Sequence, residues 1–387
     1  MIMTIVKQAA GVVAGSALVC LALPVAPVAA APDVAPSGSP PSRSTLLQQA
    51  GRVVAAGVPG VTIETRDDRG TRSVVAGVGN LRTNKPPSPS GQFRIGSITK
   101  SFTSTLVLSL VADGKIDLDA PIDHYLPGLL PYPEPITVRQ LLQHRSGLYD
   151  YANVLWPNPK VMAESRHLDY APADLVRIAI AAQETLPFTP GEQFLYSNTD
   201  YVILGMLVEK VTGESYAHEL SRRVLGPAGL RDTYLPGHHP RLRQPSARGY
   251  EAVDSSGRLT DLTTYNMSVA WASGDLVSTT HDLNLFYSAL FGGRLLPLPL
   301  LRQMQQSDDA FPGFEYGLGL GHTEMCGQQV WGHQGGVPGY GTYSFTSPQS
   351  ARKITISVNR SLTLSPAAED AINALIAVEF CGDPAEG

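Results

Sequence analysis

The sequence predicts an α+β fold in which one antiparallel sheet is formed from both ends of the chain. Two observations predict it. Short strand-like segments occur near the N-terminus and again, consecutively, in the last quarter, and the pattern between them is mostly helical. We therefore expect an α/β sandwich, with helices flanking the sheet and a mostly helical lobe inserted between its two parts.

Local signals place the individual elements. The predicted strands are residues 61–65, 73–76, 316–320, 329–332, 340–346 and 353–359. The predicted helices are residues 45–56, 97–113, 137–143, 173–183, 199–212, 282–291 and 366–380, with another in TGESYAHELSRRVLGPAGL. The turn Asp-Asp-Arg-Gly at 67–70 joins the first two strands. Gly114 ends the helix that begins at Ser97, and Gly226-Pro227 is expected to break the helix in the middle of the chain.

Length and charge limit the possible functions. The chain has 387 residues, of which 43% are hydrophobic, and a formal net charge of −5. This is enough for a large core in one big domain or two lobes. This mildly negative charge gives no sign of the basic patch that nucleic-acid binding requires, so we expect no nucleic-acid partner.

The first 30 residues have the composition of a secretory signal peptide. Lys7 supplies the positive charge, residues 9–23 are apolar, and Val-Ala-Ala ending at Ala30 fits the small-residue cleavage rule. An uncleaved membrane anchor is the alternative, but the apolar run is short and two prolines follow it. We expect cleavage near Ala30 and a secreted, extracellular protein without a stable membrane anchor.

The rest of the chain divides into a leader and one domain. Residues 31–43 are rich in Pro, Ser and Ala, which is typical of a flexible leader. Residues 44–382 form the predicted domain, with a sheet lobe from 44–115 plus 275–382 and a helical lobe from 116–274.

Two cysteines remain after removal of the signal peptide, Cys326 and Cys381. An even pair in an oxidising compartment predicts one disulfide, which would tie a late strand region to the last helix. Two buried free thiols are the alternative.

A Ser-x-x-Lys pattern, Ser97 to Lys100 in GSITKSF, opens the long apolar helix. Residues three apart share one helical face, so the lysine amine can reach a serine hydroxyl, which needs a neighbour to take its proton before it can attack. The start of a helix also favours a developing oxyanion. The pattern alone is weak, because about one match is expected by chance. Ser350 to Lys353 also matches, in a turn that enters a strand.

A Tyr-x-Asn triplet, Tyr196 to Asn198, precedes another helix. A phenol beside an ammonium can have a lowered pKa, so Tyr196 could act as general base and later as general acid. Asn198 could donate a hydrogen bond to a substrate carbonyl. A plain helix N-cap is the alternative. Residues 151–153 give a second match.

The third pattern is His333-Gln334-Gly335, on a predicted strand in VWGHQGGVPGYGTY. A polar or cationic side chain there can shape the field of the site. The small residues allow a substrate backbone to lie along the strand, and a nearby backbone N–H can complete an oxyanion hole. A glycine-rich turn with an incidental histidine is the alternative.

In this order the three patterns resemble the serine penicillin-recognising family, in particular its class C β-lactamases and secreted D-alanyl-D-alanine carboxypeptidases. The resemblance extends from about Thr45 to Cys381 and includes ITVRQLLQHRSGLYDY, YSNTDYVILGMLVEKVTG and EYGLGL. It implies a β-lactamase/transpeptidase-like fold. It also places Cys326 and Cys381 where that group has a disulfide.

The resemblance assigns a role to each matching position. Ser97 would be the nucleophile, Lys100 would take up or relay its proton, and Tyr196 would be the base for acylation and the acid for the leaving amine. Asn198 would hold the acyl-side amide, and His333 would shape the field opposite the tyrosine.

Three further positions follow from the same resemblance. Gly336 would supply the second N–H of the oxyanion hole. Trp271 and Trp156 match aromatic residues that line the cleft, although ordinary core packing explains both equally well.

Three departures concern substrate specificity. In the carboxypeptidases two threonines and an arginine grip the terminal carboxylate of the substrate, and here the positions hold Gln334, Gly336 and Gly321. A carboxylate normally requires charge-assisted donors. Gln334 or His322 could substitute.

We expect a serine hydrolase that forms an acyl-enzyme. The leading interpretation is a D-alanyl-D-alanine carboxypeptidase that acts on peptidoglycan stem peptides, with β-lactams as inhibitors or slow substrates. An esterase, a D-amino-acid peptidase or a β-lactamase acting on another small acyl donor is the alternative. A non-catalytic penicillin-binding module is a remote one. We expect no cofactor, no metal and a monomer.

Overall fold

The structure is a computed structural model that describes residues 39–348 and 351–382. The predicted signal peptide and most of the predicted leader lie outside the described residues. Within the described ranges, no helix combines the length and the apolar character that a membrane span requires.

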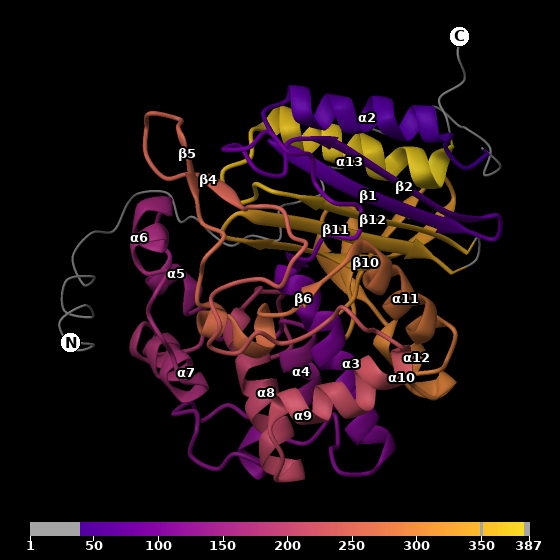
Figure 1. Ribbon diagram of the computed structural model, residues 1–387. Helices are drawn as coiled ribbons and strands as arrows, with labels where there is room; N and C mark the ends of the chain where they lie inside the picture. The colour runs from indigo at the N-terminus through magenta and orange to yellow at the C-terminus, as the bar shows by residue number, and fades with distance from the viewer. Residues whose placement is uncertain (1–38, 349–350, 383–387) are drawn as a thin grey trace.

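An antiparallel sheet forms the centre of the molecule (Figure 1). Among the described residues it has eight strands in the order β2-β1-β12-β11-β10-β9-β8-β7. The strands are β1 (Gly60–Asp67), β2 (Gly70–Gly77), β7 (Asp308–Phe311), β8 (Phe314–Tyr316), β9 (Gly321–Met325), β10 (Gln328–Val337), β11 (Tyr340–Ser347) and β12 (Arg352–Val358). Strand β1 pairs with β12, with Ile63 opposite Ile356, so the two ends of the chain share one sheet. The predicted fold class is confirmed.

Helices cover both faces of this sheet. Helices α2 (Arg43–Ala55) and α13 (Pro366–Cys381) lie side by side on one face (Figure 1). Leu46 and Ile372 from these helices pack with Ile356 in an apolar cluster of fully buried side chains. Such burial contributes about 1.5–3 kcal/mol for each large apolar side chain.

A larger apolar cluster lies beneath the opposite face and joins the sheet to the helical part. Its central helix, α3 (Thr99–Ala112), is buried on nearly every side, as expected for a helix with apolar or small residues all round. The other helices of this part are α4 (Val138–Leu142), α5 (Ala152–Leu155), α6 (Pro159–Glu164), α7 (Pro172–Ala181), α8 (Asn198–Thr212), α9 (Tyr216–Leu220), α10 (Gly226–Ala228), α11 (Thr280–Phe291) and α12 (Leu298–Met304).

Two sequence-based predictions of local structure are wrong. The strand expected at 316–320 ends at Tyr316, because the chain turns at Gly319, whose φ is +78°. The helix expected to break at Gly226-Pro227 continues there as α10, since proline is tolerated in the first turn of a helix. The chain leaves that helix only at Gly229, which has φ +76°.

Strand β10 is longer than predicted and is open at one edge. Its partner β9 pairs only as far as Gly332, opposite Gly321, whereas β11 continues alongside β10 to Val337. Within the described part of the chain, the segment 333–337 therefore has a strand on one side only. One face of this segment lies against the short 3₁₀ helix η1 (Gly96–Ile98), which precedes α3.

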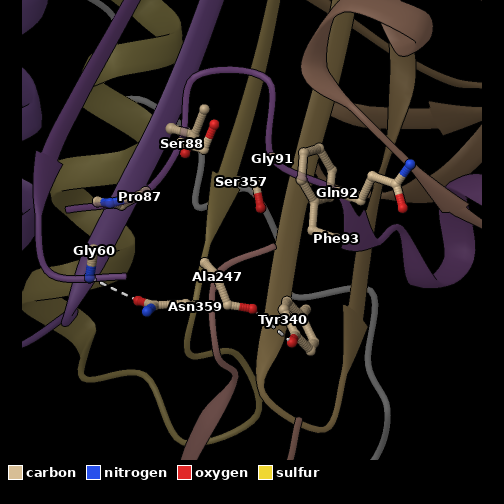
Figure 2. Close-up of a pocket in the computed structure, with 11 residues that line it drawn as sticks. Gly60, Pro87, Ser88, Gly91, Gln92, Phe93, Ala247, Tyr340, Ser357 and Asn359 are labelled. Carbon is tan, nitrogen blue, oxygen red and sulfur yellow. Dashed lines mark hydrogen bonds between the residues drawn. The ribbon is translucent and has the colours of Figure 1, made fainter. Parts of the chain in front are cut away.

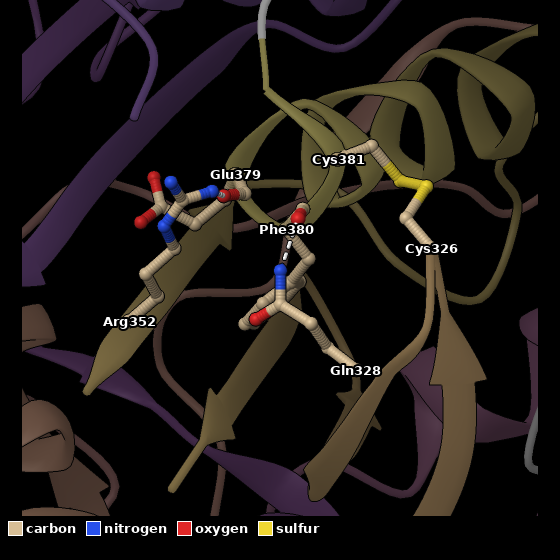
Figure 3. Close-up of a disulfide and its surroundings, with 6 residues drawn as sticks. All are labelled: Cys326, Gln328, Arg352, Glu379, Phe380 and Cys381. Carbon is tan, nitrogen blue, oxygen red and sulfur yellow. Dashed lines mark hydrogen bonds between the residues drawn. A yellow bond between two sulfur atoms is a disulfide. The ribbon is translucent and has the colours of Figure 1, made fainter. Parts of the chain in front are cut away.

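The predicted disulfide is confirmed. Cys326, in the turn between β9 and β10, is bonded to Cys381 at the end of α13, with the Cα atoms 5.4 Å apart (Figure 3). Gln328 donates its side-chain amide to the carbonyl oxygen of Phe380 at 2.6 Å, so a hydrogen bond joins the same two segments.

Glu379 lies next to this disulfide and is fully buried. Neither of its carboxylate oxygens has a hydrogen-bond partner among the described residues. Burial raises its pKa to about 8, against the opposing charges of Arg72 and Arg352. The folded protein therefore keeps this proton until about pH 8, whereas the unfolded chain releases it near pH 4.5.

The substitution Glu379→Gln is expected to stabilise the protein at alkaline pH. Between about pH 4.5 and 8 the folded state binds one proton more than the unfolded state, so wild-type stability falls as pH rises and levels off above 8. Glutamine does not titrate. We expect its advantage in the free energy of unfolding to grow by at least about 2 kcal/mol from pH 5 to pH 9.

Thermal denaturation at pH 5, 7 and 9 would measure this effect. The matched control is Glu134→Gln, which changes an exposed glutamate. An advantage of Glu379→Gln that is the same at all three values of pH would show that Glu379 is ionised in the folded protein.

Candidate active site

The nucleophile candidate lies where the chain enters α3. Gly96 adopts φ +54°, which permits the sharp turn into η1, and Ser97 follows it. Lys100 lies one turn later and its Nζ is 3.1 Å from Ser97 Oγ. The predicted sharing of one helical face is thus observed. Of the second match, Ser350 lies outside the described residues and Lys353 is on β12.

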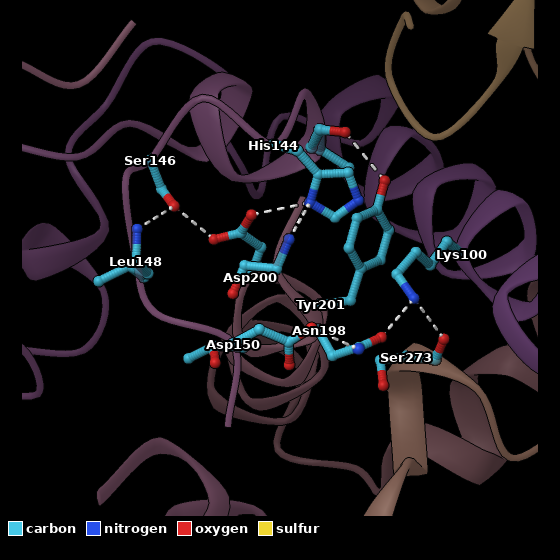
Figure 4. Close-up of polar contacts among 12 residues, drawn as sticks. Lys100, His144, Ser146, Leu148, Asp150, Asn198, Asp200, Tyr201 and Ser273 are labelled. Carbon is cyan, nitrogen blue, oxygen red and sulfur yellow. Dashed lines mark hydrogen bonds and ion pairs between the residues drawn. The ribbon is translucent and has the colours of Figure 1, made fainter. Parts of the chain in front are cut away.

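Lys100 is fully buried and its amine has three acceptors, of which Figure 4 shows Asn198 and Ser273. It donates to Ser97 Oγ, to Asn198 Oδ1 at 2.7 Å and to the carbonyl oxygen of Ser273 at 2.9 Å. A charged ammonium has three N–H donors, so this geometry fits the protonated lysine. A neutral amine would fit as well, by accepting the serine hydroxyl and donating to the other two oxygens, so the uptake or relay of the serine proton by Lys100 stays a prediction.

Two residues of the Tyr-x-Asn triplet contact the same lysine. The centroid of the Tyr196 ring is 4.8 Å from Lys100 Nζ, within the range of a cation–π contact. Asn198 begins α8 and directs its side-chain oxygen to the amine. The second match, at 151–153, is structural: the buried Tyr151 donates its hydroxyl to the carbonyl oxygen of Val269 at 2.6 Å.

One face of β10 packs directly against η1. A Cβ atom at Gly335 would overlap the carbonyl oxygen of Ile95 and lie 2.8 Å from the amide nitrogen of Ser97. A Cβ atom at Gly96 would lie 2.9 Å from the amide nitrogen of Gly336. The backbone amides of Ser97 and Gly336 are therefore close neighbours, which is consistent with the predicted oxyanion hole.

His333 is buried on the same face of β10 as Gly335 and is uncharged at neutral pH. Its Nε2 lies 3.0 Å from the hydroxyl of Tyr316, and its Nδ1 lies 2.5 Å from the carbonyl oxygen of Gln334. Burial, with a smaller contribution from the charge of Lys100, lowers the pKa of His333 to about 3. The third motif thus contributes a neutral dipole to the site.

A sequence model of the beta-lactamase family matches residues 46–379. The chain belongs to the beta-lactamase family. Its fold is the β-lactamase/transpeptidase-like fold of serine hydrolases, as the resemblance of the three motifs implied.

Three similar proteins illustrate the family. Penicillin-binding protein 4* of Bacillus subtilis is 28% identical over 69% of this chain and 60% of its own length. A D-aminopeptidase of Cereibacter sphaeroides is 25% identical over 84% of this chain and 61% of its own length. The solved structure of a D-stereospecific amidohydrolase from a Streptomyces species is 34% identical, with a TM-score of 0.78, and the match covers 88% of this chain and 99% of that one. The chain spans about 60% of the length of the first two relatives.

The two tryptophans expected in the cleft make packing contacts inside the fold. Trp271 lies against Gly205 in α8, where an added Cβ would come within 2.7 Å of the indole ring, and its ring centroid is 5.3 Å from that of Tyr216. Trp156 is only 7% exposed and contacts Tyr265 edge to face. Core packing accounts for both observations, and their contacts with substrate stay predictions.

The three positions that bind the terminal carboxylate in carboxypeptidases hold no hydroxyl or cationic group here. A side chain at Gly321 would overlap the ring of Phe314. Gln334 pairs across the strands with Tyr343, which belongs to the cluster covered by α2 and α13, so its predicted substrate contact stays a prediction. His322, the other possible substitute, lies 3.0 Å from Glu315 and stacks on a tryptophan.

Asp150 is a site residue that sequence reasoning missed. It is 6% exposed and accepts hydrogen bonds from Asn198 Nδ2 at 2.8 Å and from the amide of Ala152 at 2.9 Å. Asn198 thereby bridges Lys100 and a carboxyl group. Burial raises the pKa of Asp150, and the charge of Lys100 acts in the opposite direction. No local signal in SGLYDY distinguishes this aspartate from a loop residue, since only the fold brings it to Asn198.

A separate pocket lies near the ends of β1, β11 and β12 (Figure 2). Its lining includes Pro87, Gln92, Tyr340 and Asn359, and none of the motif residues. Asn359 accepts a hydrogen bond from the amide of Gly60 there at 2.6 Å. This hydrogen bond links the start of β1 to the end of β12.

Proposed function

We propose that this chain is a secreted serine hydrolase that cleaves small amides and peptides with a free amino group on a D-residue. Ser97 would carry the acyl group. This differs from the leading sequence-based interpretation, a D-alanyl-D-alanine carboxypeptidase, and takes up its alternative. Relatives that are named as a D-aminopeptidase and a D-stereospecific amidohydrolase support the change.

The charge of the site carries the proposal. A carboxypeptidase substrate presents a carboxylate, which requires cationic donors. Glycines 321 and 336 provide none, and Lys100 already donates to three protein acceptors. The group next to Asn198 is instead the carboxyl group of Asp150, 2.8 Å away. An ammonium group at the acyl end of a substrate would be attracted to it, and would also favour its ionised form.

The proposed reaction has two steps. Ser97 Oγ attacks the substrate carbonyl and its proton passes to the Tyr196 phenolate, which a positive charge on Lys100 would stabilise. The N–H groups of Ser97 and Gly336 stabilise the oxyanion. Tyr196 then returns the proton to the leaving amine. Water attacks the acyl-enzyme by the same route, which releases the D-amino acid and restores the serine hydroxyl.

Paired substrates test the specificity. We expect D-alanine p-nitroanilide to be hydrolysed with a kcat/KM at least about tenfold above that of its N-acetyl derivative, because only the first carries an ammonium group. Asp150→Asn should lower kcat/KM about tenfold or more for the free amine, mainly through KM. The N-acetyl substrate is the internal control and should change little.

Hydrolysis of diacetyl-Lys-D-Ala-D-Ala distinguishes the proposed activity from that of a carboxypeptidase. Release of D-alanine from this peptide faster than from the free-amine substrate would contradict the proposal. Turnover of simple acyl esters with neither amide cleaved would indicate an esterase.

We also propose export of the protein and acylation of Ser97 by β-lactams. The disulfide between Cys326 and Cys381 supports export, because such bonds persist in oxidising compartments. Similarity to a penicillin-binding protein supports acylation by β-lactams.

A further inference from the structure

His144 is a fully buried histidine with an uncommon backbone conformation. It follows α4 and has φ +56°, which non-glycine residues rarely adopt. Its Nε2 has no hydrogen-bond partner among the described residues. Burial, and to a smaller extent the charge of Lys100, lowers its pKa well below the usual value. A phenylalanine would remove this unpaired nitrogen, but it would also remove the partner of the Ser197 amide and of the Asp200 carboxyl group.

His144 holds the chain on both sides of Tyr196. Its carbonyl oxygen accepts the amide of Leu195 at 2.8 Å, and its Nδ1 accepts the amide of Ser197 at 3.3 Å. The imidazole also lies on the Tyr196 ring, with the centroids 4.2 Å apart and the planes tilted by 40°. One residue therefore fixes both neighbours of the phenol and one face of its ring.

Asp200 in turn fixes the imidazole (Figure 4). Its Oδ2 is 2.9 Å from His144 Nδ1, and its Oδ1 accepts the hydroxyl of Ser146 at 2.5 Å. Both members of the pair are fully buried. Burial raises the pKa of Asp200 well above its usual value, which favours a neutral pair in which Nδ1 is the acceptor. Asp200 lies in the first turn of α8, the helix that Asn198 begins.

We propose that His144, held by Asp200, is a positioning residue for Tyr196. It keeps the phenol beside Lys100 in the geometry that proton transfer from Ser97 requires. This inference rests on the proposed function, in which Tyr196 is the base. It assigns no proton transfer to His144 itself, because the imidazole acts only through the segment that it holds.

Two substitutions separate positioning from packing. His144→Phe keeps a ring on Tyr196 but removes the acceptor for Ser197. His144→Asn removes the ring, tolerates a positive φ, and places an oxygen near the position of Nδ1. We expect His144→Phe to lower the rate constant for acylation of Ser97 by a fluorescent penicillin about 30–100-fold, since small displacements of a reacting group cost about that much. The KM for the amide substrate should change little. His144→Asn should recover the rate to within about fivefold of wild type.

The melting temperatures of both variants should be measured together with these rates. If His144 were purely structural, the variant with the lower melting temperature would also have the lower acylation rate. A rate for His144→Phe near that of wild type, or equal losses in His144→Phe and His144→Asn, would overturn the inference.

Tyr196→Phe distinguishes failure of the inference from failure of the proposed function. We expect this variant to be nearly inactive, and His144→Phe to cause no further loss in its background. Acylation of Tyr196→Phe at the wild-type rate would remove Tyr196 as the base and overturn both proposals. Full loss in Tyr196→Phe with no loss in His144→Phe would overturn the positioning role alone.

Discussion

Replacing Ser97 by alanine is expected to abolish acylation of the protein and its hydrolytic activity. The substitution removes only the hydroxyl group, whose oxygen lies 3.1 Å from Lys100 Nζ. Without it no acyl-enzyme forms, so labelling by a fluorescent penicillin should disappear and kcat/KM should fall by at least about 10⁴-fold. Mass spectrometry of protein incubated with the penicillin would show the adduct in the wild type alone.

The second Ser-x-x-Lys match provides a matched control. Ser350→Ala removes a hydroxyl from the same sequence pattern and should leave labelling and activity at wild-type levels. Persistent labelling of Ser97→Ala would place the nucleophile elsewhere and remove the basis of the proposed function.

The second large effect is expected from Gly335→Ala. The added methyl group would overlap the carbonyl oxygen of Ile95 and approach the amide nitrogen of Ser97 to 2.8 Å. Both are backbone atoms, so β10 and η1 would have to separate. That separation would move Gly336 away from Ser97 and open the proposed oxyanion hole, whose single donors contribute about 10²–10³ in kcat. We expect kcat/KM to fall at least about 100-fold.

Two other Gly→Ala variants control for this effect. Gly51→Ala lies in α2 with nothing within 4 Å of the added atom, and should leave activity unchanged and stability equal or higher. Gly336→Ala meets the hydroxyl of Ser361 at 2.8 Å, a side chain that can turn away, and should cost less than Gly335→Ala. Equal activity in Gly335→Ala and Gly51→Ala would show that β10 does not hold the oxyanion site.

The three motifs were recognisable because each depends on short-range geometry. Ser97 and Lys100 are three residues apart at the start of one helix, and His333 and Gly335 lie two residues apart on one strand. Local sequence patterns do not predict the length of β10 or the start of β9 at Gly321. Those depend on which strands pair, and pairing is decided by contacts between distant parts of the chain.

The charge of His333 illustrates the same limit. Its residue type allows a cation near neutral pH, but burial lowers its pKa to about 3. Asp150 shows the opposite case, in which an ordinary loop aspartate becomes part of the site because Asn198 folds against it.

The sequence by itself thus determined the family, the nucleophile candidate, the two ends of the sheet and the disulfide partners, since these follow from motif spacing, periodicity and cysteine count. Only the tertiary structure decided what surrounds the nucleophile. It placed a carboxyl group beside Asn198, filled the space next to Gly321 with Phe314 and set His144 against Tyr196. The physical reason is that burial, electrostatic environment and close backbone approach arise between residues that are far apart in the chain and meet only when it folds.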